Sequence, residues 1–168
     1  MNNPIDNIVW LDIFELNPND YNPNVVYNKE LKSLELSLVT NGWIQPILVN
    51  KEGDEYVIID GFHRYSLAKT SKKLLARDKG RVPCAVLELN EAERMLLTIR
   101  INRAKGSHIA CKMSEIIKTL VEKHSMPIDK IMKGIGGTKD EIDLLLMDDV
   151  FKKLDIQNHK YSKAWYPR

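Results

Sequence analysis

The 168-residue sequence predicts an α+β fold, in which a small mixed sheet with helices is followed by a C-terminal helical region of helix-turn-helix type. Three observations indicate this. Short β-rich runs and helical patterns alternate up to about residue 97, as expected when strands and helices pack on one another. From there on only helical periodicity continues. Hydrophobic residues make up 43% of the chain, which suffices for a packed core.

The first half supplies the predicted strands. A β-rich run at 8–13 comes first, and 17–23 holds two Asn-Pro steps that favour a turn-rich loop. Apolar residues at helical spacing predict a helix over 28–41, ended by Asn41-Gly42. Three further segments are then expected: a hairpin of strands 46–50 and 56–60, a helix from about Arg64 to Lys73, and a strand over 81–89.

The second half is expected to be helical. The predicted helices cover 91–101, 113–124, 127–133 and 138–147. Pro127 suits a first helical turn, and Thr138 with Glu141 forms a capping-box pattern. We therefore divide the chain into a sheet-containing domain at 1–97, a helical domain at 98–150 and a tail at 151–168. Trp165 and Tyr166 of the tail are expected to dock on the core or on a second subunit.

Charge is distributed unevenly along the chain. Residues 1–97 carry 11 basic and 14 acidic side chains, whereas residues 98–168 carry 14 and 9, for a net charge of +2. The basic half suits a polyanionic partner or a solvated helical surface, and both interpretations stay open. Cys84 and Cys111 lack metal-ligand spacing. With no apolar run of about 20 residues and a polar N-terminus, we expect a cytoplasmic protein without membrane contact.

The most informative segment is Asp60-Gly61-Phe62-His63-Arg64, where a predicted strand gives way to a helix. A helix N-terminus presents unpaired N–H groups and partial positive charge to an anion. Gly61 allows close backbone approach, Arg64 can fork onto phosphate oxygens, and His63 can donate beside it. Taken alone, the segment is equally compatible with a strand–helix junction that has a capping Asp and two surface cations.

Three more motifs accompany this one, in order. They are Leu16-Asn17-Pro18-Asn19-Asp20-Tyr21-Asn22-Pro23, Gly42-Trp43-Ile44-Gln45-Pro46-Ile47-Leu48-Val49 and Asn102-Arg103. Together with 60–64, the set resembles the boxes of the ParB/sulfiredoxin-like superfamily, which includes the partition-protein N-terminal domain, sulfiredoxin and a free-serine kinase. The resemblance covers about residues 8–105. It implies that residues 1–97 form a nucleotide-binding domain.

The resemblance implies a phosphate pocket and a ligand. The residues that it implies in nucleotide binding are Gly42, Gln45, Gly61, His63, Arg64, Asn102 and Arg103. The implied ligand is a nucleoside di- or triphosphate, ATP/ADP or CTP, with Mg²⁺. Similarity to the kinase group implies that Asp60 is a catalytic base or a Mg²⁺ contact.

Departures from the family pattern limit which activities carry over. Phe62 stands where sulfiredoxin has its catalytic cysteine, so the chain is not expected to be a sulfiredoxin. Phe62 also replaces the acidic residue of the partition-protein box, and Ile101 stands where the third box has Glu. The CTP hydrolysis and clamp closure of partition proteins are therefore not carried over to this chain. The remaining glycine and cations can still bind phosphate.

DNA contact is expected from outside the last helix. Residues 138–149 contain one cation and five carboxylates, so this helix is predicted to pack on the core or a partner, not to enter a major groove. Arg100, Arg103 and Lys105, followed by His108, form a better basic cluster, which is expected either to line the nucleotide pocket or, through Arg100, Lys105 and His108, to contact nucleic acid. Residues 103–108, the acidic helix and the Trp-containing tail resemble a phage and prophage branch that includes immunoglobulin-binding regulator B. That branch implies transcription co-activation and a phosphoadenosine-phosphosulfate reductase-like partner.

The leading hypothesis is a nucleotide-binding regulatory protein of phage or mobile-element type. It would act in DNA transactions (partition or transcription co-activation) through a partner or an oligomer such as a homodimer. The alternative is an enzyme of the same fold, a Mg²⁺-dependent small-molecule kinase or nucleotide hydrolase that uses Asp60. A scaffold that binds no nucleotide is the third interpretation.

Overall fold

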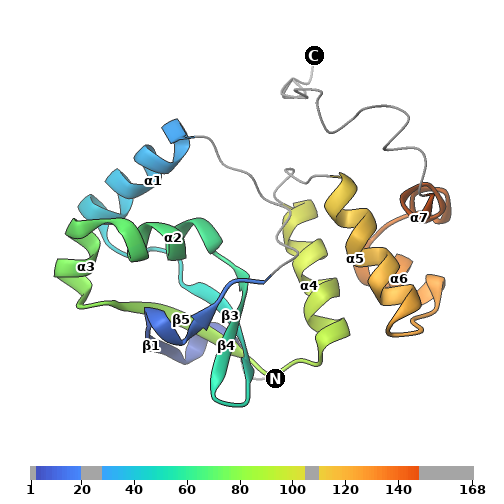
Figure 1. Cartoon of the computed structure of the whole chain (residues 1–168), viewed down its shortest axis with the longest axis horizontal. Helices are drawn as coiled ribbons and strands as arrows, with labels where there is room; N and C mark the ends of the chain where they lie inside the picture. Colours follow the sequence, from blue (N-terminus) through green and yellow to red (C-terminus); the bar gives the residue numbers. More distant parts are fainter. Residues whose placement is uncertain (1–2, 20–27, 105–109, 148–168) are drawn as a thin grey trace.

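The computed structural model describes residues 3–19, 28–104 and 110–147, and these residues form an α+β fold (Figure 1). The described strands are β1 (Ile8–Asp12), β2 (Leu16–Asn17), β3 (Ile47–Glu52), β4 (Glu55–Asp60) and β5 (Arg81–Leu87). The described α-helices are α1 (Asn28–Asn41), α2 (Phe62–Thr70), α3 (Lys72–Asp78), α4 (Glu91–Ala104), α5 (Ala110–Glu122), α6 (Ile128–Ile135) and α7 (Lys139–Leu146). Short 3₁₀ turns, Pro4–Asp6 and Ile13–Glu15, flank β1.

The strands form one mixed sheet in the order β1-β5-β3-β4-β2. The predicted hairpin is present, since β3 and β4 pair antiparallel around the 53–54 turn. β5 pairs antiparallel with β1 and parallel with β3, and β2 pairs parallel with β4. β1 is therefore an edge strand, and its Ile8, Val9 and Trp10 are between 37% and 43% exposed.

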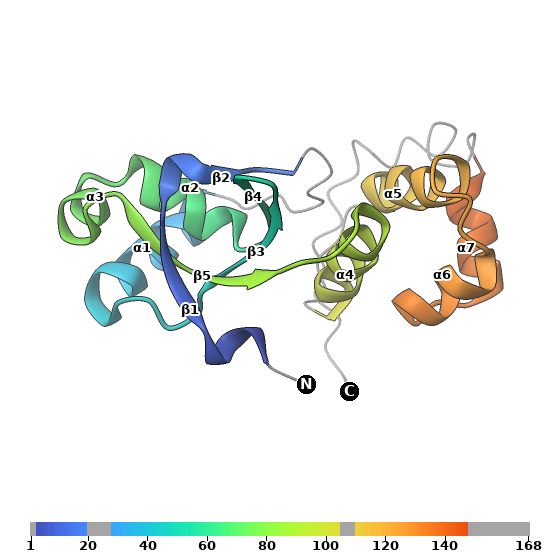
Figure 2. The ribbon, with the colours of Figure 1, turned by 90° about the horizontal axis from the view of Figure 1, so that it is seen from below.

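Apolar clusters divide the described residues into two regions. In one, the sheet packs against α2, and a smaller cluster joins α1, α2 and α3. In the other, buried side chains of α5, α6 and α7 pack against one side of α4. Figure 1 shows α1–α3 together on one side of the sheet, and Figure 2 shows α4 between the sheet and α5–α7. We call these regions the sheet half and the helical half.

α4 belongs partly to both halves. Its Met95, Leu96 and Ile99 are buried in the core of the helical half, although the first two precede the predicted boundary at 97/98. That boundary falls inside α4. The division at 1–97 and 98–150 stays a prediction, and the 151–168 tail, with Trp165 and Tyr166, lies outside the described residues.

The single helix predicted from Arg64 to Lys73 is wrong, because the structure has two helices there. α2 ends at Thr70, and Ser71 adopts an extended conformation with ψ 114°. Its hydroxyl accepts a hydrogen bond from the N–H of Leu74 and caps α3. Serine favours such local side-chain bonds over continued helix, which is why the chain turns at this point.

Other features concern the local environment of single residues. Cys84, on β5, is fully buried, and burial raises the pKa of its thiol to about 12.

Thr138 caps α7 as predicted, since its hydroxyl accepts a hydrogen bond from the N–H of Glu141. Within the described ranges, no helix combines the length and apolar character that a membrane span requires.

Candidate nucleotide-binding site

Two sequence motifs, Gly42–Val49 and Asp60–Arg64, meet at one pocket. It has a volume of about 200 Å³ and lies between α1, the loop that follows it and the start of α2. Its lining residues are Leu34, Ser37, Leu38, Gly42, Ile44, Gln45 and Arg64. Three of these, Gly42, Gln45 and Arg64, were predicted from the sequence as phosphate-binding residues. The described fold thus brings them together.

Gly61 occupies a position that other residues would strain. It is the N-cap of α2 and has a φ of 97°, a left-handed conformation that suits glycine. An added Cβ would lie 3.2 Å from Nη2 of Arg64 and 3.3 Å from the Cα of Ile47. Gly61 itself has no side chain that could cap the N-terminus of α2. The turn therefore requires glycine both for its conformation and for space.

Arg64 folds back from α2 onto the loop that precedes β3. Its Nη1 donates to the carbonyl oxygens of Gln45, at 2.8 Å, and of Pro46, at 2.5 Å. Its Nη2 lies 3.2 Å from the carboxylate of Asp60, and the Arg64 side chain is only 11% exposed. Burial lowers the pKa of Arg64, while the Asp60 carboxylate acts in the opposite direction. The guanidinium thus bonds to the loop and to the end of strand β4 at once.

Asp60 and His63 complete the strand–helix turn. The Asp60 carboxylate forms the ion pair with Arg64, as expected if it orients that side chain. The His63 ring stands edge-on to Phe62, with ring centres 5.9 Å apart. The described residues contain no cluster of three or more His, Cys, Asp or Glu side chains that could hold a metal. Nucleotide-bound Mg²⁺ needs only one or two carboxylates, so the role of Asp60 toward Mg²⁺ stays a prediction.

A second polar network holds the far side of the same loop. Trp43 donates from its indole nitrogen to the Asp78 carboxylate at 2.8 Å, and Arg77 donates to the same carboxylate. Arg77 also donates to the carbonyl of Leu38, at the end of α1. Sequence reasoning missed this network, because adjacent Arg77 and Asp78 give no signal for a partner 35 residues away.

A known protein family matches the part of the chain that contains this pocket. The ParB N-terminal domain family matches residues 2–102, which is more than half of the chain. The chain belongs to the ParB N-terminal domain family. This confirms the superfamily and the α+β fold class expected from the sequence.

Two curated relatives and one solved structure resemble this ParB-family chain. The Escherichia coli K12 protein YbdM, which is uncharacterized, is 38% identical and covers 96% of this chain and 77% of its own length. A nucleoid occlusion protein of Bacillus thuringiensis is 28% identical over 82% of this chain. The chain spans only 46% of that relative. C-terminally truncated ParB of Caulobacter crescentus, complexed to the centromeric parS site, shares the fold with a TM-score of 0.53 and 23% identity, over 88% of this chain and 77% of that one.

The ParB-like third box, on α4, faces a different environment. Asn102 is buried, at 3% exposure. Arg103 forms an ion pair with Glu141 of α7, and Arg100 donates to the carbonyl of Gly134, in the last turn of α6, at 2.7 Å. The structure thus connects both arginines to the helical half, whereas Gly42, Gln45 and Arg64 share the pocket. Lys105 and His108 lie outside the described residues.

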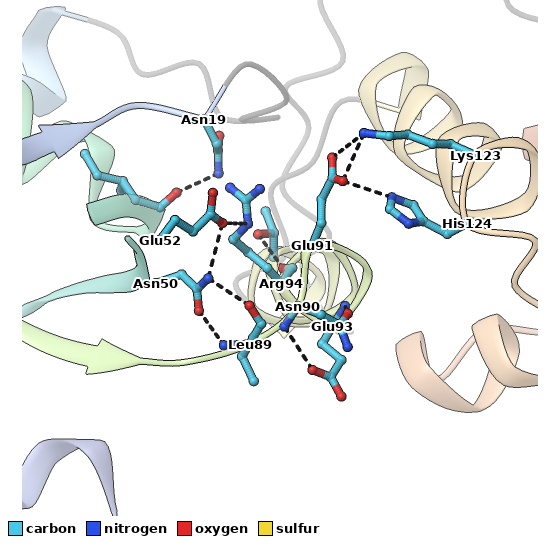
Figure 3. A network of polar contacts seen from close by, with 12 residues as sticks. Asn19, Asn50, Glu52, Leu89, Asn90, Glu91, Glu93, Arg94, Lys123 and His124 are labelled. Atoms are coloured by element: carbon cyan, nitrogen blue, oxygen red, sulfur yellow. Dashed lines mark hydrogen bonds and ion pairs between the residues drawn. The ribbon is translucent and has the colours of Figure 1, made fainter. Parts of the chain in front are cut away.

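A polar seam joins α4 to the sheet in this ParB-family fold (Figure 3). Asn50 of β3 is fully buried, and its side chain pairs with the Leu89 backbone, accepting from N–H at 2.7 Å and donating to C=O at 2.9 Å. One turn into α4, Arg94 is buried and lies 3.1 Å from the Glu52 carboxylate. Asn90 caps α4 through the N–H of Glu93. These contacts fix where α4 begins relative to the sheet.

Proposed function

We propose that this ParB-family protein binds a nucleotide through its phosphates and acts in DNA transactions. The convergence of Gly42, Gln45 and Arg64 on one pocket carries the proposal, because it joins two family boxes beside a helix N-terminus. Gly61 provides no side-chain cap to α2, so we expect the first N–H groups of this helix to be available to an anion. The Gln45 side chain and His63 would add donors at the same end.

The size of the pocket suits part of a nucleotide. Its volume of about 200 Å³ is below the roughly 300 Å³ at which small-molecule pockets begin. The phosphates would therefore occupy the pocket, and the base would extend toward the surface past Ile44, which is 72% exposed. CTP and ATP or ADP, with Mg²⁺, are the ligands to test. Asn102 and Arg103 would contact the nucleotide only if α4 moved toward the pocket when the nucleotide binds.

The DNA part of the proposal is supported by the kinds of relative that match. One relative is a nucleoid occlusion protein, and the solved ParB with this fold is complexed to parS DNA. In this chain Arg103 is paired with Glu141, and α7 carries Asp140 and Asp143. Direct insertion of α7 into DNA is therefore not proposed. Contact would come through a partner or a homodimer, in a partition or co-activation role. A phage or mobile-element setting and a reductase-like partner extend the proposal on the strength of sequence resemblance.

Calorimetric titration with ATP, ADP, CTP and GTP, each with Mg²⁺, tests the pocket. We compare the wild type with Gln45→Glu, which keeps side-chain size but adds a negative charge at an exposed pocket residue. Repulsion of the phosphates is expected to weaken binding by about tenfold or more, equivalent to about 1.4 kcal/mol.

Asn7→Asp is the matched control, because it makes the same amide-to-acid change at an exposed residue next to β1. It should bind like the wild type. If Gln45→Glu and the wild type bind nucleotide with equal affinity, the phosphates do not bind in this pocket. A wild-type protein that binds none of the four nucleotides would contradict the proposed function.

A further inference from the structure

We propose that a basic surface on helix α3 binds the phosphate backbone of duplex DNA without reading its sequence. We call it the α3 surface, and it consists of Lys72, Lys73 and Lys79. The inference deepens the DNA part of the proposed function and rests on that part, because it names where this chain itself contacts DNA. None of the three lysines lines the pocket beside Gly42.

The first observation is a concentration of positive charge in a half that is otherwise acidic. Residues 69–81 hold six basic side chains and one acidic side chain. The rest of residues 1–97 holds five basic and 13 acidic side chains. Positive charge in the sheet half is therefore gathered in one short segment, which is the electrostatic pattern of a surface that binds a polyanion.

Helix α3 presents this charge to solvent. Its Leu74 is only 1% exposed and packs in the cluster that contains Leu38 and Leu67. Lys72 and Lys73, which precede Leu74, are exposed. Figures 1 and 2 both show α3 at the end of the molecule opposite to the helical half. A duplex on α3 would therefore lie away from the acidic helix α7.

The lysines of α3 differ from the arginines beside them in their contacts. Arg77 forms an ion pair with the neighbouring Asp78, and Arg81 donates to a backbone carbonyl of β1. Lys72 and Lys73 form no ion pair or side-chain hydrogen bond with any residue that the structure describes. Their ammonium groups keep all three donors for an external anion.

The stability of α3 does not explain why two lysines stand at its start. Lys72 and Lys73 are its first two residues, and its first turn contains no acidic side chain. A cation at this end of a helix faces the positive end of the helix dipole, which is unfavourable. Contact with an external polyanion accounts for both charges at this place.

The surroundings of the lysines favour duplex DNA over other polyanions. Membrane surfaces and single-stranded nucleic acids are bound with apolar or aromatic side chains beside the cations. Within residues 62–81, all of which the structure describes, no large hydrophobic side chain is exposed. Lysine contacts phosphate as a point charge and carries no information about the bases. The seven residues of α3 span about 10 Å, the rise of about three phosphates along one DNA strand.

Fluorescence anisotropy with two short labelled duplexes of unrelated sequence, over a series of salt concentrations, tests the inference. The wild type should bind both duplexes with equal affinity. Lys72→Gln/Lys73→Gln should bind both about tenfold more weakly at low salt, and the slope of log K against log salt should decrease by about 1 to 2. Loss of two cations from the first turn favours the helix, so the variant should unfold at a Tm no lower than that of the wild type.

Lys51→Gln/Lys139→Gln is the matched control, because it removes the same charge from two exposed lysines that are each followed by a carboxylate, Glu52 and Asp140. It should bind both duplexes like the wild type. Equal losses in the two double variants would show that only net charge matters and would overturn the inference. Wild-type affinity of Lys72→Gln/Lys73→Gln would also overturn it, and would leave the DNA part of the proposed function in place.

Two further measurements separate the possible failures. Wild-type protein that binds vesicles of phosphatidylserine and phosphatidylcholine but no duplex would make a membrane the partner, and wild-type protein that binds neither would leave α3 without a polyanion. Both results overturn the inference. Titration of Lys72→Gln/Lys73→Gln with CTP and ATP, each with Mg²⁺, should match the wild type, because the pocket contains neither lysine. If the wild type binds duplex through α3 but binds no nucleotide, the nucleotide part of the proposed function fails and the α3 surface stands.

Discussion

The sheet half and the helical half are held together by different kinds of contact. The core of the helical half consists of buried Ile, Leu and Met side chains, with Ile117, Leu120, Ile131 and Ile142 fully buried. The sheet half also has an apolar core, but its loop and helix ends are fixed by Arg64, Trp43 and Asp78. The comparison indicates that apolar packing sets the stability of the helical half, whereas polar contacts shape the pocket.

The largest expected effect comes from a cavity in the helical half. Leu120→Ala removes a fully buried side chain and should lower the free energy of unfolding by about 2–5 kcal/mol. Urea unfolding followed by circular dichroism measures this. Leu144→Ala is the matched control, since Leu144 is 47% exposed on α7, and it should change stability by about 0.5 kcal/mol or less. Equal losses in the two variants would contradict an apolar core at Leu120.

A smaller effect is expected at the polar seam between the halves. Asn50→Ala leaves the N–H and C=O of Leu89 without their side-chain partner, which should cost about 1–3 kcal/mol. Urea unfolding and amide exchange at Leu89 measure the loss. Asn41→Ala, at the exposed end of α1, is the control and should change stability by about 0.5 kcal/mol or less. If amide exchange at Leu89 does not become faster in Asn50→Ala, Asn50 does not help to fix the position of α4.

The smallest effect is a pH dependence in the sheet half. Burial tends to raise the pKa of Asp78, but hydrogen bonds from Arg77 and Trp43 outweigh it and lower that pKa below the ordinary value of 3.8. A lowered pKa means that Asp78 stabilises the fold above about pH 4 and that this contribution is lost as pH falls further. Its size should be about 1 kcal/mol or less.

Asp78→Asn tests this pH dependence. The wild type should exceed the variant in unfolding free energy at pH 6, and the difference should shrink toward pH 3. A difference that is constant over that range would exclude titration of Asp78 as its cause. Thermal unfolding of both proteins across the pH series is the measurement.

The same comparison explains which features could be predicted from the sequence. Helix α1 was predicted at its observed bounds, and Thr138 was identified as a cap, because both depend on neighbours within four residues. The approach of the Gly42–Gln45 loop to Arg64 followed from family resemblance. The spacing of apolar residues could not reveal that Ser71 interrupts the helix. A serine can either continue a helix or cap the next one, and the two conformations are close in free energy.

Side chains that reach across the fold were the hardest to predict. Arg103 stands in a family nucleotide box, yet its partner is Glu141, 38 residues later. Asn50 looked like an ordinary strand residue, and its pairing with Leu89 spans 39 residues. Such contacts depend on how α4 lies between the halves. Spacing along the chain carries no information about that placement.

The thiol of Cys84 is shielded from reaction while the sheet half is folded. With a pKa of about 12 and no exposed surface, it is neither a thiolate at neutral pH nor within reach of an alkylating reagent. Alkylation of Cys84 therefore requires that strand β5 first separates from its neighbours β1 and β3. In a Cys111→Ala variant, the rate at which an alkylating reagent modifies Cys84 therefore measures how often the sheet opens.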